Sequence, residues 1–302
     1  MTPLLRVRYL AEYAVLRLLW LLLALVPPAR AYGLGAALGG LWYRFSRERR
    51  SVARGNILAA GIAASPAEAA RIARASFRHF TGHLLENLRV PDVLGAANWP
   101  AHVVLEGPEE ALALVRDTDR PILLATAHLG CWEVCGYWIS LLRPLLAIAR
   151  PMNNPYVQRF LRRRFRTDIT LLPKNQAFSA ETLRAWEQRR AALAIVMDQH
   201  AGRSGLWMEV LGRPASVHTS PARLHLMTGH PIVAGCLLRE GPLRYRALAA
   251  PPIRVAPSGD READTRAVLA QLNAFFEGAI RRCPEQYLWM HRRWRTPPAA
   301  QR

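Results

Sequence analysis

A histidine and a carboxylate stand five positions apart in the run His128-Leu-Gly-Cys-Trp-Glu133, where an apolar stretch gives way to a segment with helical spacing. A neutral imidazole can take a proton from a hydroxyl near pH 7, and a carboxylate on the other ring nitrogen would stabilise the imidazolium that forms. On one continuous helix the two side chains would point roughly 140° apart, so they can meet only across a turn. Gly130 offers the backbone freedom for such a turn, and the amides that open the next helix could stabilise charge on a carbonyl oxygen. This chemistry suits acyl transfer, and the alternative is a core histidine beside a glutamate that opens a helix.

The elements that must position this motif alternate between short apolar runs and segments with helical spacing. Strands are predicted at 103–106, 122–127, 145–149, 192–197, 232–238 and 243–249, and helices at 66–87, 109–116, 132–142, 155–166, 179–190, 220–228 and 264–282. Such alternation predicts an α/β fold with a mixed, largely parallel sheet covered by helices. Reactive groups in these sheets gather at the carboxyl ends of strands. His128, Arg150 and Asp198 each follow a predicted strand.

Polar side chains after two other strands are further candidates for the site. Arg150, Asn153 and Asn154 combine a permanent cation with two amides, which could hold a phosphate, a pantetheine amide or an oxyanion. Asp198 and Gln199 follow the strand predicted at 192–197. The alternatives are that Asp198 is a turn residue and that Asn154 caps a helix.

The helix predicted at 155–166 carries a cluster of arginines. They cannot all point the same way, because residues on a helix are distributed around its axis. Part of the cluster is therefore a solvated face, and Arg163 and Arg164 are candidates for an anion-binding track.

Composition limits the class of protein and its partners. The 302 residues are 51% apolar, enough to bury one sizeable core, or one core with an appended element. Forty-one basic residues against 22 acidic ones give a net charge of +19, and Lys174 is the only lysine. Because arginine forms forked pairs with phosphate and carboxylate, we expect an anionic lipid, an acidic carrier protein or a nucleic acid as partner. No nucleic-acid recognition signature is present, so we predict no nucleic-acid partner, and a basic nucleic-acid-binding protein is only the distant alternative. The cysteine spacing predicts no metal site.

The N-terminus is largely apolar from Leu10 to Val26, with an uninterrupted part that is too short to span a bilayer. Three interpretations are open: a cleavable secretory signal, a retained membrane anchor and a buried core helix. Small residues at Gly35, Gly39 and Gly40, followed by the basic run 44–50, favour a retained anchor on anionic lipid. We therefore predict a membrane-associating helical segment at 1–50 and a catalytic domain at 51–302.

The chain resembles the bacterial lipid A biosynthesis late acyltransferases, the lauroyl and myristoyl transferase family within the lysophospholipid acyltransferase-like group. The matching motifs occur in the order of the family and extend over nearly the whole chain. They are the N-terminal apolar helix, the run 128–133, Arg150-Pro with Asn154-Pro155, Asp198-Gln199 with Gly202, the run 212–215 and the closing run 284–295. The closing pattern Tyr-x-Trp-x-His-Arg-Arg discriminates best, because no general structural reason makes it recur.

The resemblance implies transfer of a fatty acyl chain from a thioester on acyl carrier protein, or less often on coenzyme A, to a hydroxyl of a lipid A precursor or similar membrane glycolipid. It implies no further cofactor, and a place at the inner membrane with the catalytic domain on the cytoplasmic face. His128 would be the general base and Glu133 its orienting partner, with Arg150 and Asp198 lining the site. His200, Ala201 and the run 207–211 depart from the pattern. The acyl length and the acceptor therefore stay open, and a lysophospholipid or a phosphoinositide mannoside is the alternative acceptor.

Overall fold

A computed structural model describes residues 2–149, 152–165, 168–173, 176 and 178–295. Within these residues seven strands form one sheet in the order β1-β9-β8-β2-β5-β3-β4. Neighbouring strands are parallel, apart from the antiparallel pair β8 and β9. The strands are β1 (Val103–Glu106), β2 (Ile122–Thr126), β3 (Leu145–Ile148), β4 (Ile169–Leu172), β5 (Ala192–Val196), β8 (Ile232–Gly241) and β9 (Arg244–Ala249). A separate antiparallel hairpin is made by β6 (Leu206–Val210) and β7 (Arg213–Val217).

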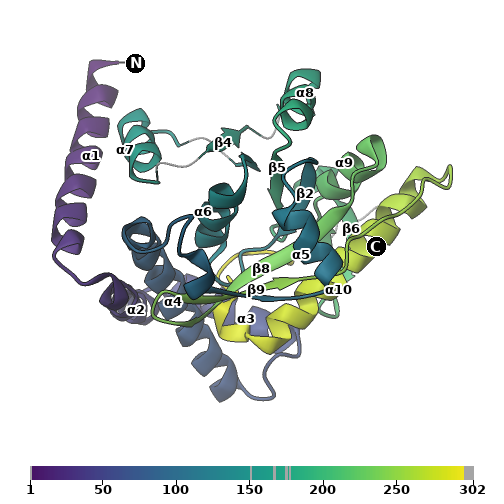
Figure 1. The fold of residues 1–302 in the computed structure, drawn as a ribbon. Coiled ribbons are helices and arrows are strands. Elements are labelled where there is room, and N and C mark those ends of the chain that lie inside the picture. The colour runs from purple at the N-terminus through teal and green to yellow at the C-terminus, as the bar shows by residue number, and fades with distance from the viewer. Residues whose placement is uncertain (1, 150–151, 166–167, 174–175, 177, 296–302) are drawn as a thin grey trace.

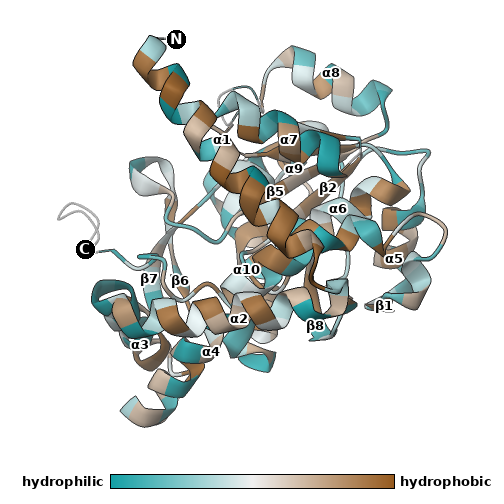
Figure 2. Ribbon diagram, turned by 90° about the vertical axis from the view of Figure 1, so that its left-hand side faces the viewer, coloured by the Kyte–Doolittle hydropathy of each residue, from teal (hydrophilic) through white to brown (hydrophobic). Residues whose placement is uncertain are grey.

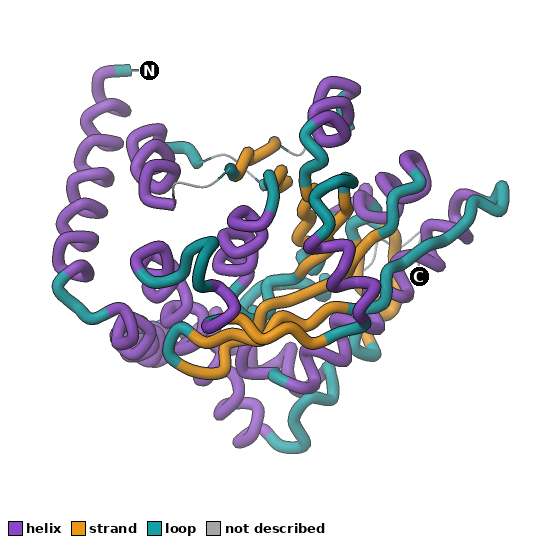
Figure 3. The backbone as a smooth tube through the Cα atoms, in the orientation of Figure 1, coloured by secondary structure: helices purple, strands orange, loops and turns teal. Residues whose placement is uncertain are grey.

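Helices cover both faces of the sheet, as Figures 1 and 3 show. On one face α5 (Glu109–Arg116) and α6 (Trp132–Leu142) bury their apolar sides. The other face is covered by α3 (Arg47–Ala59), α4 (Pro66–Arg89), α9 (Ser220–Thr228) and α10 (Arg261–Arg282), and α8 (Ala180–Gln188) adds the buried Trp186 to the same core. The predicted mixed, largely parallel sheet covered by helices is confirmed.

Small side chains line part of the α6 face of the sheet. Successive residues of a strand point to opposite faces, and the α4 and α10 side carries Leu123 and Ile195 beside small residues such as Ala125 and Ala234. On the α6 side many are small, and the small ones that border open space are Ala147, Ala149, Ala194, Gly235, Ala247 and Ala249. Small residues leave unfilled volume between the sheet and the helices above it.

Helix α2 (Pro28–Phe45) packs unusually close to α4. A Cβ on Gly35 would lie 2.3 Å from the Thr81 carbonyl oxygen, and one on Gly39 would lie 2.2 Å from Thr81 Oγ1. Any larger residue at these two positions would push the helices apart. The prediction that small residues here allow close helix packing is confirmed for Gly35 and Gly39.

The first helix, α1 (Pro3–Ala24), is not a core helix, so that interpretation of the N-terminus is wrong. Leu23 is its buried residue, whereas Leu4, Leu18 and many other apolar side chains are exposed. Figure 2 shows apolar residues along the length of α1 and again on α2. Among the described residues no helix combines the length and the apolar character needed to cross a bilayer. Helix α1 packs against α7 (Pro155–Phe165) instead.

Candidate active site

His128 and Asp198 meet because the strands that precede them are neighbours in register. Strands β2 and β5 are parallel and pair Thr126 with Val196, so the residues two positions beyond each strand lie side by side. His128 donates from Nδ1 to Asp198 Oδ1 at 2.8 Å, and its backbone N–H donates to the same oxygen at 3.0 Å. The carboxylate thus fixes both the ring and its backbone.

The electrostatics of this pair prepare His128 to act as a base. Burial favours the neutral form of both groups, but the charge of Asp198 and its hydrogen bond still hold the pKa of His128 above its ordinary value. Although burial raises the pKa of Asp198, His128 and Arg293 lower it far more, so the carboxyl stays ionised. With its proton on Nδ1, the ring has a lone pair on Nε2, 3.2 Å from the amide nitrogen of Gln199.

Glu133 does not orient His128, and this corrects the prediction from the motif. Asp198 occupies Nδ1, while Glu133 lies in the first turn of α6 with its Oε2 at 3.3 Å from Nδ1 of His83 on α4. Burial raises the pKa of Glu133 to about 7. The motif spacing identified the turn correctly, but the carboxylate that orients His128 is Asp198, which follows β5.

Gly130 makes the turn between His128 and α6, as predicted. Its φ of +67° lies in the left-handed region, and a Cβ would stand 2.1 Å from the Leu237 carbonyl oxygen. Its N–H donates to the Gln286 carbonyl at 3.0 Å, and its own carbonyl lies 3.0 Å from His79 Nε2. Helix α6 begins two residues later, and the amides of its first turn have no carbonyl partner within the helix.

The closing segment of the chain, residues 284–295, packs against this turn and holds it in place. Leu288 donates from its backbone N–H to the His128 carbonyl at 3.1 Å, and Tyr287 forms a β-bridge with Leu129. Arg293 is buried, donates to the Asp198 carbonyl and contacts the Tyr287 hydroxyl at 3.2 Å. The sequence analysis assigned no individual role to Tyr287 or Arg293, although the closing motif contains both.

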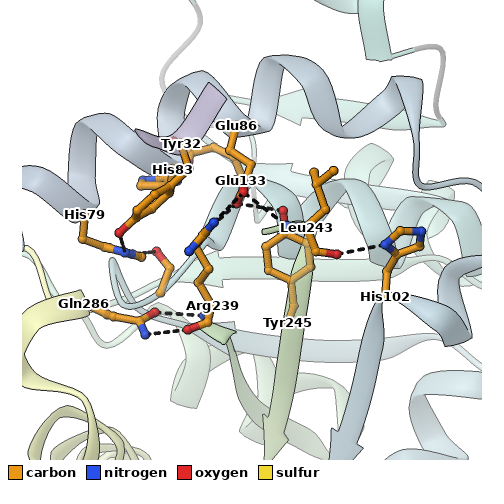
Figure 4. A network of polar contacts seen from close by, with 11 residues as sticks. Tyr32, His79, His83, Glu86, His102, Glu133, Arg239, Leu243, Tyr245 and Gln286 are labelled. Carbon is orange, nitrogen blue, oxygen red and sulfur yellow. Dashed lines mark hydrogen bonds and ion pairs between the residues drawn. The ribbon is translucent and has the colours of Figure 1, made fainter. Parts of the chain in front are cut away.

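A second buried network fixes the elements around the turn, as Figure 4 shows. Glu86 of α4 is fully buried and pairs with Arg239 of β8 through two bonds of 2.9 and 3.0 Å, and Tyr245 donates to it at 3.0 Å. Arg239 also lies 3.5 Å from the centre of the Tyr32 ring. Gln286 binds the Arg239 backbone amide and carbonyl, each at 2.9 Å. Because Gln286 also accepts from Gly130, the network holds the turn rigidly against the sheet.

His128 opens onto a large, mainly apolar cavity of about 1520 Å³. His128, Glu133 and Gln199 line it together with Trp132. The cavity also borders the small residues of the sheet and the helices α5, α6 and α7. The arrangement places a base at the wall of a space suited to a long apolar group.

Comparison with known proteins decides the family. The sequence-family model of the bacterial lipid A biosynthesis acyltransferases matches residues 2–296 of this chain. This chain belongs to that family. It is similar to the lipid A biosynthesis palmitoleoyltransferase of Escherichia coli (strain K12), at 26% identity over 97% of this chain and 94% of that protein. It is also similar to the lipid A biosynthesis lauroyltransferase of the same organism, at 26% identity over 98% of this chain and 95% of that protein. Among solved structures, it is similar to the 1-acyl-sn-glycerophosphate acyltransferase PlsC from Thermotoga maritima, at 13% identity, a TM-score of 0.36, and coverage of 80% of this chain and 96% of that one.

The substrate contacts expected at the start of α7 in this acyltransferase have mixed outcomes. Arg150 lies outside the described residues. Asn153 is exposed beside the cavity-lining Met152, and its role stays a prediction. Asn154 is buried, donates to the Tyr9 carbonyl at 2.9 Å and to Glu12 at 3.0 Å, and accepts from the first amides of α7. It caps α7 and ties it to α1, so its assignment to substrate binding is wrong.

The two arginines predicted to bind anions, Arg163 and Arg164, have different surroundings. Arg163 is exposed and lines the cavity of the acyltransferase. Arg164 instead pairs with Asp92 at 2.6 Å, donates to the Leu88 carbonyl at 3.1 Å and lies 4.6 Å from the centre of the Trp20 ring. Arg164 is therefore a structural residue that joins α1, α4 and α7, contrary to the prediction.

Proposed function

We propose that this acyltransferase moves a fatty acyl chain from a thioester on acyl carrier protein or coenzyme A to a hydroxyl of a lipid A precursor or similar glycolipid. The observation that supports this most strongly is that His128, with a lone pair on Nε2, lines a mainly apolar cavity of about 1520 Å³. A base beside a fatty-chain pocket is what transfer to a lipid hydroxyl requires.

In the proposed reaction, His128 Nε2 takes the proton of the acceptor hydroxyl while its oxygen attacks the thioester carbonyl. Asp198 keeps the ring in the required tautomer and stabilises the imidazolium. The amides at the start of α6 that have no carbonyl partner within the helix would stabilise charge on the carbonyl oxygen. Because a thioester is already activated, no covalent enzyme intermediate is needed, and positioning the reactants can contribute about 7 to 11 kcal/mol.

The acyl chain would lie along the small residues of the sheet. Ala147, Ala194 and Gly235 border the cavity, and replacing them by large residues would fill it. The names of the two relatives, which transfer palmitoleoyl and lauroyl groups, agree with a cavity for a long chain.

The basic face of α7 would attract the anionic part of the substrates. Arg159, Arg162 and Arg163 are exposed and line the cavity, and arginine suits both the phosphates of a glycolipid and the acidic surface of a carrier protein. Gln199, Arg150 and Asn153 are the further substrate contacts in this proposal.

The exposed apolar residues of α1 and α2 would hold the enzyme on the cytoplasmic face of the inner membrane. Leu18, Leu22, Leu38 and Leu41 are exposed. Arginines near the start of α1 and at both ends of α2 suit anionic headgroups. This arrangement would bring the cavity to the membrane where a lipid acceptor lies.

The test is turnover by the purified full-length protein on lipid vesicles. Acyl carrier protein and coenzyme A thioesters would be offered with a lipid A precursor, a lysophospholipid or a phosphoinositide mannoside as acceptor, and the products identified by mass spectrometry. We expect acylation of the lipid A precursor. Acylation of only the lysophospholipid or the mannoside would move the assignment to that acceptor, and unchanged turnover by His128→Ala would remove His128 as the base.

A further inference from the structure

Glu133 and His83 form a second histidine–carboxyl pair whose chemistry the reaction above does not use. His83 is 0% exposed, and Glu133 Oε2 is buried against it at 3.3 Å from Nδ1. In the described part of the chain, neither ring nitrogen of His83 nor Glu133 Oε2 has a hydrogen bond of good geometry. Buried polar groups nearly always have such a bond, so this pair calls for an explanation.

The surroundings of the pair keep it neutral. The ring of His83 stacks on His79 at 5.5 Å between centres and meets the Trp132 ring at 4.2 Å. The titratable groups that face the pair are His79 from α4 and Cys131 and His128 from the turn after β2. The Trp132 side chain and the Glu133 backbone N–H also hydrogen-bond the Glu133 carboxyl. Figure 4 shows His79 and His83 one turn apart on α4. Burial raises the pKa of Glu133 to about 7 and lowers that of His83 well below its ordinary value. The carboxyl can therefore hold a proton near neutral pH.

Glu133 also has access to the reacting groups. Its side chain is 33% exposed, although Oε2 is buried, and it lines the same cavity as His128. One carboxyl oxygen thus faces His83 while the rest of the group reaches the cavity. The two carboxyl groups beside His128 have pKa values pushed in opposite directions, raised for Glu133 and lowered for Asp198, which is the usual mark of two carboxyls with different roles at one site.

We propose that Glu133 is the acid that protonates the departing thiolate of the acyl donor, and that His83 is the residue that positions its carboxyl group. This inference rests on the proposed function, because it needs a thioester donor. It gives Glu133 a catalytic part distinct from the orienting part that Asp198 performs.

The protons and bonds of the proposed step balance. His128 Nε2 takes the proton of the acceptor hydroxyl as the new C–O bond forms. The C–S bond then breaks with its electron pair on sulfur, and the sulfur takes the proton of Glu133. The imidazolium of His128 returns its proton to the Glu133 carboxylate, which His83 Nδ1 stabilises in the meantime. The sum moves one proton from the alcohol to the thiol and needs no further reactant.

The experiment compares two donors that carry the same acyl chain but differ in the leaving thiol. One is the thioester of N-acetylcysteamine, an alkyl thiol, and the other is the thioester of thiophenol, whose thiolate is stable enough to leave unprotonated. For Glu133→Gln we expect a loss of about 100-fold or more in kcat with the alkyl thioester and little loss with the aryl thioester. Glu133→Asp, which keeps an acid, should recover part of the alkyl activity.

His83→Asn tests the positioning role by the same ratio. We expect it to lower the alkyl rate more than the aryl rate, by less than Glu133→Gln does. A merely structural role for either residue would lower both rates equally, and that result would overturn the inference. His128→Ala should lose activity with both donors, and full activity there would overturn the proposed function instead.

The wild-type protein gives an independent measurement if a variant fails to fold. Its rate with the alkyl thioester should fall as the pH rises through the pKa of Glu133, because the acid form is lost. The rate with the aryl thioester should show no such fall. The same high-pH fall with both donors would overturn the inference.

Discussion

Two histidine–carboxyl pairs flank one turn of this molecule, and their environments give them opposite protonation states. In the His128–Asp198 pair the atoms are 2.8 Å apart, the carboxylate is ionised and the pKa of the histidine is raised. In the His83–Glu133 pair they are 3.3 Å apart, burial raises the pKa of the carboxyl to about 7, and the pKa of the histidine is lowered. The same residue types therefore supply a base in one place and an acid in the other.

The difference arises from what else contacts each carboxyl group. Asp198 accepts from the His128 backbone N–H as well as its ring, and the charge of Arg293 lies nearby. These donors and charges outweigh the cost of burying the carboxylate. Glu133 also accepts from its own backbone N–H and the Trp132 side chain and lies near the charge of His128, but these do not outweigh the effect of its burial. The balance between burial and the surrounding donors and charges decides the role of each carboxyl, and the spacing of the motif does not reveal that balance.

The largest effect should come from removing the base. We expect His128→Ala to lower kcat by about 10²- to 10⁴-fold, because general-base catalysis typically contributes that much. The matched control is His230→Ala, since His230 also pairs with a carboxylate, Glu187, at 2.7 Å but does not line the cavity. Steady-state kinetics should show near-normal rates for the control, and equal losses in the two variants would count against His128 as the base.

Asp198→Asn should separate orientation from charge in the ionised pair. We expect a rate loss on the order of 10- to 100-fold, by analogy with the partners of metal-binding histidines. Since the charge of Asp198 raises the pKa of His128, the pH at which kcat/KM rises should also move downward in the variant. A rising limb that stays in place would show that another group controls it.

The sequence predicted most of the fold, because apolar periodicity sets the type of each element. The strand Val103–Glu106 and the helices Glu109–Arg116, Trp132–Leu142 and Ser220–Thr228 are observed with the predicted bounds. The sequence analysis did not predict β4 or the hairpin of β6 and β7. The burial pattern of β4 is half exposed, so its apolar signal was weak.

The orienting carboxylate could not be assigned from the motif, because sequence proximity does not determine which strands are neighbours. Glu133 is near His128 in sequence, whereas Asp198 reaches it only through the pairing of β2 with β5. Nothing in the sequence pattern marked His83 as a site residue, apart from its position one helical turn after His79 on α4. The ties of Asn154 and Arg164 to α1 depend on where α1 packs, which neither residue reveals.

Gly130→Ala tests whether both pairs depend on the shared turn. The left-handed φ of +67° costs an alanine roughly 1 to 2 kcal/mol, and its Cβ would collide with the Leu237 carbonyl at 2.1 Å. We expect a lower free energy of unfolding in urea titrations, together with reduced activity on both the alkyl and the aryl thioester. Gly278→Ala is the control, because a Cβ there meets nothing within 4 Å, and its helical site should gain about 0.5 to 1 kcal/mol. Unchanged stability in Gly130→Ala would mean that the turn relaxes without cost.

The smallest effect should be a pH-dependent change in stability when the neutral pair loses its ionisable carboxyl. The folded protein binds the Glu133 proton more tightly than the unfolded chain, because burial raises the pKa from 4.5 to about 7. Stability is therefore lost as the pH rises through this range, and Glu133→Gln escapes that loss. We expect the Tm of the variant to equal that of the wild type near about pH 4.5 and to exceed it by a few degrees near about pH 8. A Tm difference that is the same at both pH values would show that the pKa of Glu133 is not raised in the folded protein.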